Sequence, residues 1–296
     1  MKKQIKLLLI ATLLSFTTMA YAKVNAVVSI LPQQTFLKAI GGDKVNISLM
    51  VKPGNSPHAY EPKPSQMKDI SKADIYFTIG VEFEHSWIPK FSNQNKTMKI
   101  VNMSDGIKKL TIEKHSHHHN DEKQHEDENH EDEEGENKDP HIWTSTNNVK
   151  TIASNILKEL IKIDSKNTPY YKTNYEKFLT HIEQTNTNIK NILKDIPHDS
   201  KFMVFHPAWG YFAKQYHLTQ LAIEVEGKNP KPKAIAYLIE EAKEENVKAV
   251  FTAPEFSAKV ATQISNEVGI KVIKVSPLNP KWSQNLENLA RAIANK

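Results

Sequence analysis

The sequence predicts an α/β protein of two similar lobes, each a mainly parallel sheet flanked by helices, joined by one long rigid helix. Short apolar runs alternate with segments of helical periodicity in both halves of the chain, a pattern typical of parallel βαβ units. A much longer helical segment lies between the halves. The length of 296 residues allows two domains at roughly 150 residues each.

The first 22 residues have the features of a cleavable signal peptide. Three lysines precede a short apolar run over residues 7–16, and Ala20 and Ala22 place small residues where a signal peptidase reads them. We expect cleavage before Lys23 and export to a bacterial periplasm. No later segment approaches the ~20 apolar residues of a spanning helix, so no stable membrane insertion is expected.

The first lobe is predicted over residues 23–166. Apolar and β-branched runs predict strands at residues 24–30, 45–51, 74–79 and 98–103. Apolar residues at helical spacing predict helices at residues 33–40, 64–71, 85–91 and 145–163. Gly41 and Gly42 end the first of these helices, and Pro64 begins the second.

The joining helix is predicted over residues 167–197. Asn167 and Pro169 are start signals, apolar residues recur at helical spacing from residue 171 to 193, and Pro197 ends the pattern. At 1.5 Å per residue, about 25 residues reach roughly 38 Å, which is longer than a small domain is wide. We therefore expect a rigid spacer between the lobes.

The second lobe is predicted over residues 198–296. Its strands are predicted at residues 202–205, 219–225, 249–252 and 271–275. Its helices are predicted at residues 211–216, 234–246, 257–268 and 282–294. The two halves therefore repeat one architecture.

Residues 114–138 interrupt the first lobe with six of the thirteen histidines among acids, Asn, Gln and Lys. A segment with almost nothing apolar cannot pack a core, so we predict a disordered loop. It is either a solvated spacer or an accessory collector of metal. Because a flexible loop loses entropy when it orders, its sites should bind metal more weakly than a preorganised one.

Composition excludes several other sites and partners. The absence of cysteine excludes disulfides, thiolate metal sites and a lipid anchor on a cysteine at the cleavage point. Residues 113–139 hold twelve acids against three lysines, so the overall charge of +5 conceals a more basic remainder. That remainder has a single arginine and no basic segment with interleaved aromatic residues, so no nucleic-acid partner is expected.

Three histidines outside the loop, His58, His141 and His206, each adjoin a proline. Proline restricts its own backbone and that of the preceding residue, so each imidazole leaves a chain with few conformations. His206 also follows a predicted strand directly, where open α/β sheets hold their ligands. One such histidine is typical of an ordinary hydrogen-bonded residue, but three in an exported, cysteine-free chain indicate a metal site.

Four motifs in this order resemble the metal-binding solute receptors of ABC transporters that import zinc or manganese. They are PHAYEP at residues 57–62, DPHIW at 139–143, FHPAWGYF at 205–212 and FTAPEF at 251–256. The resemblance covers essentially the whole mature chain. It implies one metal ion in the cleft between the lobes, ligands His58, His141 and His206, no enzymatic activity, and a membrane permease with its ATPase as partners.

The resemblance favours Zn²⁺ as the transported ligand. Zinc receptors of this family carry a His- and acid-rich insertion ahead of the second ligand, and manganese receptors replace the third histidine with an acid. Imidazole donors suit Zn²⁺, Cu²⁺ and Ni²⁺, whereas Mn²⁺ prefers oxygen donors. We therefore expect a monomeric extracytoplasmic receptor for high-affinity zinc uptake, with a receptor for manganese or another divalent metal as the alternative.

A zinc hydrolase or lyase is the rival from a different class, because three histidines and a water also surround catalytic zinc. Such an enzyme needs a positioned general base and a substrate pocket. The sequence has no HExxH motif, and we interpret the nearest carboxylates as solvated or helix-capping. The binding function is therefore favoured.

The fourth ligand stays open. The family often has Asp before Pro-Leu near the end of the second lobe, and here Ser276 takes that place. For Glu255, a structural role as the partner of a helix N-terminus or a lysine is at least as well supported as a role as ligand. The alternatives for the fourth position are water, which we favour, or Glu61, Glu82, Glu84, His85 or a residue of the loop, and a site with only three protein ligands is the remaining alternative.

Four aromatic residues lie near the motif histidines in the sequence. We expect them to form an apolar wall that excludes water from the metal. They are Tyr60, Trp143, Trp209 and Tyr211.

Overall fold

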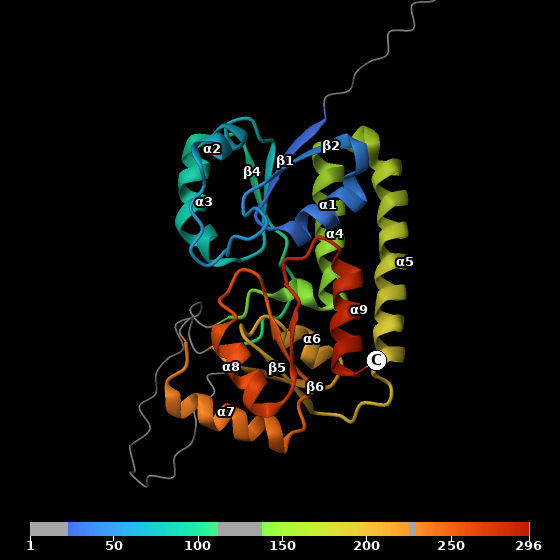
Figure 1. The fold of residues 1–296 in the computed structure, drawn as a ribbon. Helices are drawn as coiled ribbons and strands as arrows, with labels where there is room; N and C mark the ends of the chain where they lie inside the picture. Colours follow the sequence, from blue (N-terminus) through green and yellow to red (C-terminus); the bar gives the residue numbers. More distant parts are fainter. Residues whose placement is uncertain (1–22, 112–137, 225–228, 296) are drawn as a thin grey trace, which may run out of the picture.

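The computed structural model describes residues 23–111, 138–224 and 229–295, which form two lobes, one above the other in Figure 1. Each lobe is built on a four-stranded parallel sheet flanked by helices. The predicted α/β fold of two similar lobes is therefore confirmed. The predicted signal peptide, residues 1–22, and the predicted loop, residues 114–138, except for Lys138, lie outside the described residues.

The first lobe contains the sheet β2-β1-β3-β4, with every neighbouring pair parallel. Its strands are β1 (Val24–Val28), β2 (Val45–Leu49), β3 (Ile75–Thr78) and β4 (Lys99–Asn102). Its helices are α1 (Leu31–Gly41), α2 (Pro64–Ile70), α3 (Glu82–Gln94) and α4 (Thr146–Ile163). Helix α3 begins three residues earlier than predicted, where Glu82 and Glu84 in the first turn complement the helix dipole.

The second lobe contains the sheet β6-β5-β7-β8, again parallel throughout. Its strands are β5 (Ser200–Val204), β6 (Leu218–Ala222), β7 (Ala249–Thr252) and β8 (Lys271–Lys274). Its helices are α6 (Gly210–Gln215), α7 (Pro232–Glu244), α8 (Lys259–Val268) and α9 (Trp282–Ile293). Strand β6 ends three residues before the predicted limit of 225, a residue that lies outside the described part of the chain.

The long helix α5 (Thr168–Leu193) runs along one side of both lobes (Figure 1). It packs against α1 and α4 of the first lobe and α9 of the second. Phe36 of α1 meets Trp282 of α9 edge to face, with ring centroids 5.3 Å apart, and Thr35 donates a hydrogen bond of 2.9 Å to the carbonyl of Pro280. The apolar core therefore continues from one lobe into the other beside α5.

Three short 3₁₀ helices were not predicted: η1 (Gly42–Lys44), η2 (Ile142–Thr144) and η3 (Ser165–Asn167). Helix η2 matters for the site because it begins directly after His141. Just before it, Lys138 pairs with Thr111 in an isolated antiparallel bridge. The two chain ends that flank residues 112–137 are thus held side by side.

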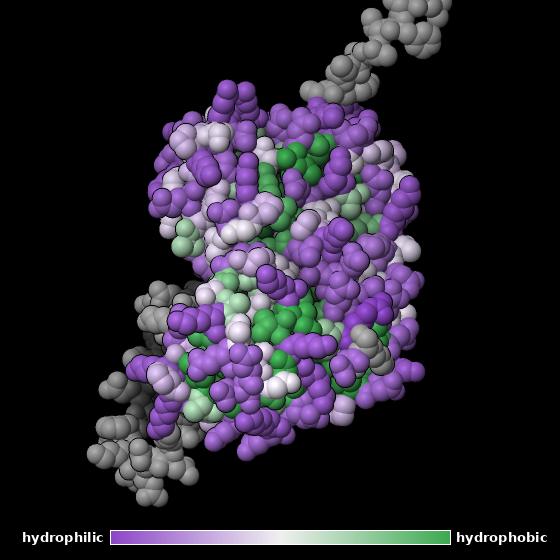
Figure 2. All heavy atoms as spheres, viewed as in Figure 1, coloured by the Kyte–Doolittle hydropathy of each residue, from purple (hydrophilic) through white to green (hydrophobic). Residues whose placement is uncertain are grey.

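The face shown in Figure 2 is mostly hydrophilic, and its outline narrows where the lobes meet. Within the described ranges, no helix has both the length and the apolar character that membrane crossing requires.

Candidate metal centre

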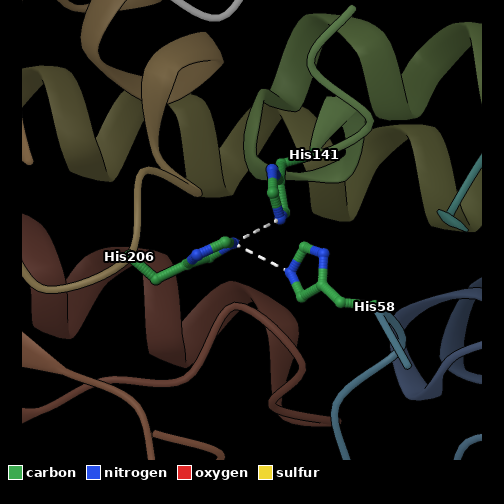
Figure 3. A group of neighbouring side chains, drawn as sticks. All are labelled: His58, His141 and His206. Carbon is green, nitrogen blue, oxygen red and sulfur yellow. Dashed lines mark hydrogen bonds between the residues drawn. The ribbon is translucent and has the colours of Figure 1, made fainter. Parts of the chain in front are cut away.

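Three imidazole rings from distant parts of the chain point to one place between the lobes (Figure 3). His58 lies in the loop after β2, His141 directly before η2, and His206 two residues after β5. The Nε2 atom of His206 is 3.0 Å from Nε2 of His58 and 3.3 Å from Nε2 of His141. The structure thus brings together the three histidines that the sequence singled out, each offering a nitrogen within 4.8 Å of the others.

These separations suit a small metal ion. Zn²⁺ in tetrahedral geometry, with Zn–N distances of about 2.0–2.1 Å, separates two ligand nitrogens by about 3.4 Å. The two Nε2···Nε2 distances of 3.0 and 3.3 Å are close to that value. A tetrahedral ion bound by the three rings would keep one position for a further ligand.

A carboxylate lies behind each ring, on the Nδ1 side away from the convergence point. The pairs are His58 with Glu82 at 2.9 Å, His141 with Asp139 at 2.7 Å and His206 with Glu224 at 3.2 Å. A neutral ring that donates its Nδ1–H to a carboxylate leaves a lone pair on Nε2. Three such lone pairs facing one another repel, and a cation between them turns that repulsion into attraction.

The interpretation of the nearest carboxylates as solvated or helix-capping is wrong for Asp139 and Glu224, which are buried, each against a histidine ring. Asp139 also accepts a 2.8 Å hydrogen bond from the backbone amide of His141, and Tyr211 donates one of 2.7 Å to the Asp139 carbonyl. The DPH spacing could have identified Asp139 as a partner of His141. Glu82 and Glu224 lie far along the chain from their histidines, and no sequence signal connects them.

The pKa of His58 in the first lobe and that of His206 in the second are shifted in opposite directions. Burial opposes the charged form of His58, but its hydrogen bond to Glu82 and the charge of that carboxylate prevail, so the pKa of His58 is raised. Burial likewise opposes ionisation of Glu82, but the hydrogen bond and charge of His58 lower its pKa to about 2. Burial of His206, only partly offset by Glu224, lowers the pKa of that ring to about 4. His206 therefore stays neutral to a lower pH than His58.

The rings line a cavity of about 260 Å³ that includes open solvent. Phe256 stacks on His206 with centroids 4.6 Å apart, and Trp143 lies 5.3 Å from His141. The remaining lining residues are Ser56, Pro57, Glu255, Pro277 and Leu278. Of the four aromatic residues expected to form an apolar wall, Trp143 does line the cavity.

The other three aromatic residues have different positions, so that part of the expectation is wrong. Tyr60 is buried and its hydroxyl donates to Gln66. Trp209 packs on Phe212, and Tyr211 supports the backbone at Asp139. Phe256, which lies in the fourth motif and was not expected in the wall, takes their place beside the rings.

Sequence comparison matches residues 26–296 to the family described as ZnuA, zinc-uptake complex component A, periplasmic. The chain belongs to this family. The resemblance that the four motifs indicated is thereby confirmed.

Relatives cover the chain broadly. The high-affinity zinc uptake system protein ZnuA of Bacillus subtilis strain 168 is 32% identical over 254 residues, which are 84% of this chain and 76% of that protein. The zinc-binding protein AdcA of Streptococcus pyogenes is 29% identical over 88% of this chain, which spans about half (51%) of AdcA. A manganese ABC transporter substrate-binding lipoprotein, PsaA of Streptococcus pneumoniae, is 27% identical over 79% of this chain and 73% of its own.

Solved structures agree with the fold. A crystal structure of ZnuA shares 40% identity, with a TM-score of 0.82 over 92% of this chain and 98% of that chain. Members of the family are solute-binding receptors, not enzymes. The lobes and the long helix are thus features that the chain shares with its family.

The residues named as alternatives to water for the fourth ligand are not among the described residues that line the cavity. Glu61 and His85 are exposed, and Glu82 contacts the far side of the His58 ring. Glu84 is buried, accepts hydrogen bonds from the amides of Ile79 and Gly80, and has a pKa that burial raises to about 7. Its position beneath the end of β3 makes it part of the first lobe's core.

Glu255 does line the cavity, and its contacts differ from those expected. The Ser276 hydroxyl donates to both of its carboxylate oxygens, at 2.9 and 3.2 Å. The interpretation of Glu255 as a partner for a helix N-terminus or a lysine is therefore wrong. The residue at the family's usual acidic position is in contact with a carboxylate from another loop.

Proposed function

We propose that this protein captures Zn²⁺ between its lobes and delivers it to an ABC-transporter permease for high-affinity zinc uptake. The observation that carries the proposal is the convergence of His58, His141 and His206 with a carboxylate on the far side of each ring. The ligands we assign are these three imidazoles. Zn²⁺ here is the cargo, not a resident cofactor.

The carboxylates behind the rings serve the cation in two ways. Each holds its ring in the tautomer that presents Nε2, and a hydrogen-bonded carboxylate makes that nitrogen a stronger donor. Their negative charge also favours a divalent cation over a neutral solute or an anion in the cleft. Asp139 and Glu224 are buried, so solvent screens their charge little.

The position of the site between the lobes suggests how cargo would be released. His58 belongs to the first lobe and His206 to the second, so any separation of the lobes lengthens the distance between two ligands. The lobes share α5 and the packing of Phe36 on Trp282, so we expect a small rocking motion on binding and release. A permease that moves the lobes apart would therefore weaken the site without unfolding either sheet.

The donor set also bears on the alternatives. Three nitrogen donors favour Zn²⁺ over Mn²⁺, which prefers carboxylate and carbonyl oxygens. A zinc hydrolase would need a carboxylate free to act as general base. Glu82, Asp139 and Glu224 are each hydrogen-bonded to a ring, and Glu255 accepts hydrogen bonds from the Ser276 hydroxyl. We propose that the protein is a receptor and not an enzyme. We also propose that it works in the periplasm as a monomer, after removal of its leader and without a lipid anchor.

Competition titration of the mature protein against a chromogenic chelator tests the function. We expect one tightly bound Zn²⁺ per chain and at least a hundredfold weaker binding of Mn²⁺. Binding of Mn²⁺ as tight as that of Zn²⁺ would favour the manganese alternative. If neither metal binds tightly to a single site, the receptor function is wrong.

A further inference from the structure

One carboxylate in the cavity wall has no role in orienting a histidine ring. Glu255 lies in the loop after β7, next to Phe256, whose ring stacks on His206 with centroids 4.6 Å apart. This stacking places the backbone at Glu255 beside the histidines. Its half-buried side chain lines the same cavity as the three rings.

The hydrogen bonds of Glu255 come from an anchored donor. The Ser276 hydroxyl contacts both Glu255 oxygens and accepts a 3.1 Å hydrogen bond from the amide of Leu278. Asn285 also holds the Ser276 carbonyl, at 2.9 Å. The serine therefore stays in place, whereas the longer glutamate side chain can turn while one oxygen keeps its bond to the hydroxyl.

We infer that Glu255 is the fourth ligand of the bound ion, with one carboxylate oxygen on Zn²⁺ and the other on the Ser276 hydroxyl. This inference rests on the proposed function. Among the described residues, Glu255 is outside the group whose donor atoms all lie within 4.8 Å of one another, so its carboxylate turns toward the rings as the ion binds. The water that leaves the ion is replaced by an anionic oxygen, which lowers the net charge of the filled site.

Other carboxylates near the site are less suited to this position. Glu82 binds His58 at Nδ1, so the ring itself separates its bonded oxygen from the ion. Asp139 and Glu224 are held in the same way behind His141 and His206. Glu255 is the one carboxylate among the described lining residues of the cavity.

The pair also explains the serine at the family's acidic position. An aspartate at residue 276 would stand against Glu255 as a like charge, whereas a serine hydroxyl donates to it. Glu255 and Ser276 together thus provide the carboxylate that a single aspartate provides in the family pattern. We expect Ser276→Asp combined with Glu255→Gln to restore tight binding.

The experiment compares wild type, Glu255→Gln and Ser276→Ala, with Glu267→Gln on the exposed face of α8 as the charge-matched control. Zn²⁺ affinity is measured by chelator competition, and Co²⁺ serves as a spectroscopic probe between pH ~7 and ~9. A metal-bound water ionises near neutral pH and would change the Co²⁺ spectrum, whereas a carboxylate ligand would not.

We expect a pH-independent Co²⁺ spectrum in wild type and a pH-dependent one in Glu255→Gln. The Zn²⁺ affinity of Glu255→Gln should fall roughly 10–100-fold, the usual loss when a polar group of a metal site is replaced. Ser276→Ala should keep the carboxylate ligand, and its Zn²⁺ affinity should fall less than about threefold.

Three results would overturn the inference. They are unchanged Zn²⁺ affinity and Co²⁺ spectrum in Glu255→Gln, equal losses in Glu255→Gln and Ser276→Ala, and a pH-dependent Co²⁺ spectrum in wild type, which needs no variant to fold. In all three the wild type still binds one Zn²⁺ tightly. Failure of wild type to bind at all overturns the proposed function itself, so the two failures are distinguishable.

Discussion

The two lobes have the same strand order but present their histidines differently. In the second lobe, His206 and Glu224 follow the adjacent strands β5 and β6, whose pairing continues through a 2.9 Å hydrogen bond from the Glu224 amide to the Phe205 carbonyl. In the first lobe, the place after β1 that corresponds to His206 is taken by the buried Ile30. The first lobe's histidine, His58, comes instead from a long loop after β2.

This difference separates a more buried histidine from a more exposed one. The side chain of His206 is 11% exposed and that of His58 is 30% exposed. Burial keeps His206 neutral and its carboxylate unscreened, while His58 remains accessible to protons, water and an arriving ion. Equal topology therefore does not mean equal exposure, because His206 follows its strand closely whereas His58 lies in a longer loop.

The largest effects should come from removing the imidazoles. Structural zinc binding of ~10–16 kcal/mol shared among four ligands gives roughly 2.5–4 kcal/mol for each, or about 10²–10³-fold in affinity. His206→Ala and His141→Ala should lie at the upper end of this range, at about 10³-fold. His58→Ala should lose about 10²-fold in Zn²⁺ affinity, because water can more easily replace a half-buried side chain than a deeper one. Chelator competition measures all three, and His181→Ala on the exposed face of α5 is the control. A larger loss in His58→Ala than in His206→Ala would contradict the comparison.

Removing the supporting carboxylates should have a smaller effect. Glu224→Gln and Asp139→Asn should weaken Zn²⁺ binding roughly 10–100-fold, the usual range for groups that orient metal-bound histidines. Glu82→Gln should lose about tenfold in Zn²⁺ affinity or less, because the Glu82 side chain is 41% exposed and solvent screens its charge. Chelator competition also measures the Zn²⁺ affinities of these three variants. Equal losses of affinity at all three positions would contradict the expected difference between the buried and the exposed carboxylates.

Falling pH should weaken Zn²⁺ binding through His58 first. A raised pKa means that His58 takes up a proton at a higher pH than an ordinary histidine, and a protonated ring cannot ligate, whereas His206 stays neutral until about pH 4. The affinity of wild type should therefore decline as pH drops below ~7. In Glu82→Gln the decline should begin at a lower pH, which is read from affinity normalised to its value at pH 8. Unchanged affinity down to pH 5 would argue for an oxygen-rich site.

Removing residues 112–137 should have the smallest effect on the tight site. Thr111 and Lys138 are paired, so a short glycine-serine turn can close the gap without displacing His141. We expect the tight Zn²⁺ affinity to change less than about threefold and the number of weakly bound ions to fall. Stoichiometry by equilibrium dialysis measures the latter. Loss of the tight ion would place the principal site in the removed segment.

Local pattern was sufficient to predict most of the fold. Apolar runs and helical spacing identified every strand and α-helix described here, because parallel strands and amphipathic helices bury their apolar residues with different periods. The errors lie at element ends, such as the start of α3 at Glu82, and in the short 3₁₀ helices, which have too few residues to show a period. Proline neighbours identified the three histidines for the same local reason.

Contacts across the chain could not be predicted in this way. The sequence carries no local signal that connects Glu224 to His206, Glu82 to His58 or Ser276 to Glu255, since each pair meets through the arrangement of sheets and loops. The prediction of an aromatic wall was wrong for the same reason. Tyr60 is near His58 along the chain, but in the folded structure its hydroxyl donates a hydrogen bond to Gln66.

The sequence by itself determined the two α/β halves, the long helix between them and the three histidines, because each depends on residues that are neighbours along the chain. Only the tertiary structure decided which carboxylate supports each ring, how deeply each ring is buried and which acid faces the cavity. Those properties depend on distances between remote segments, and such distances are fixed when the two sheets and α5 pack together.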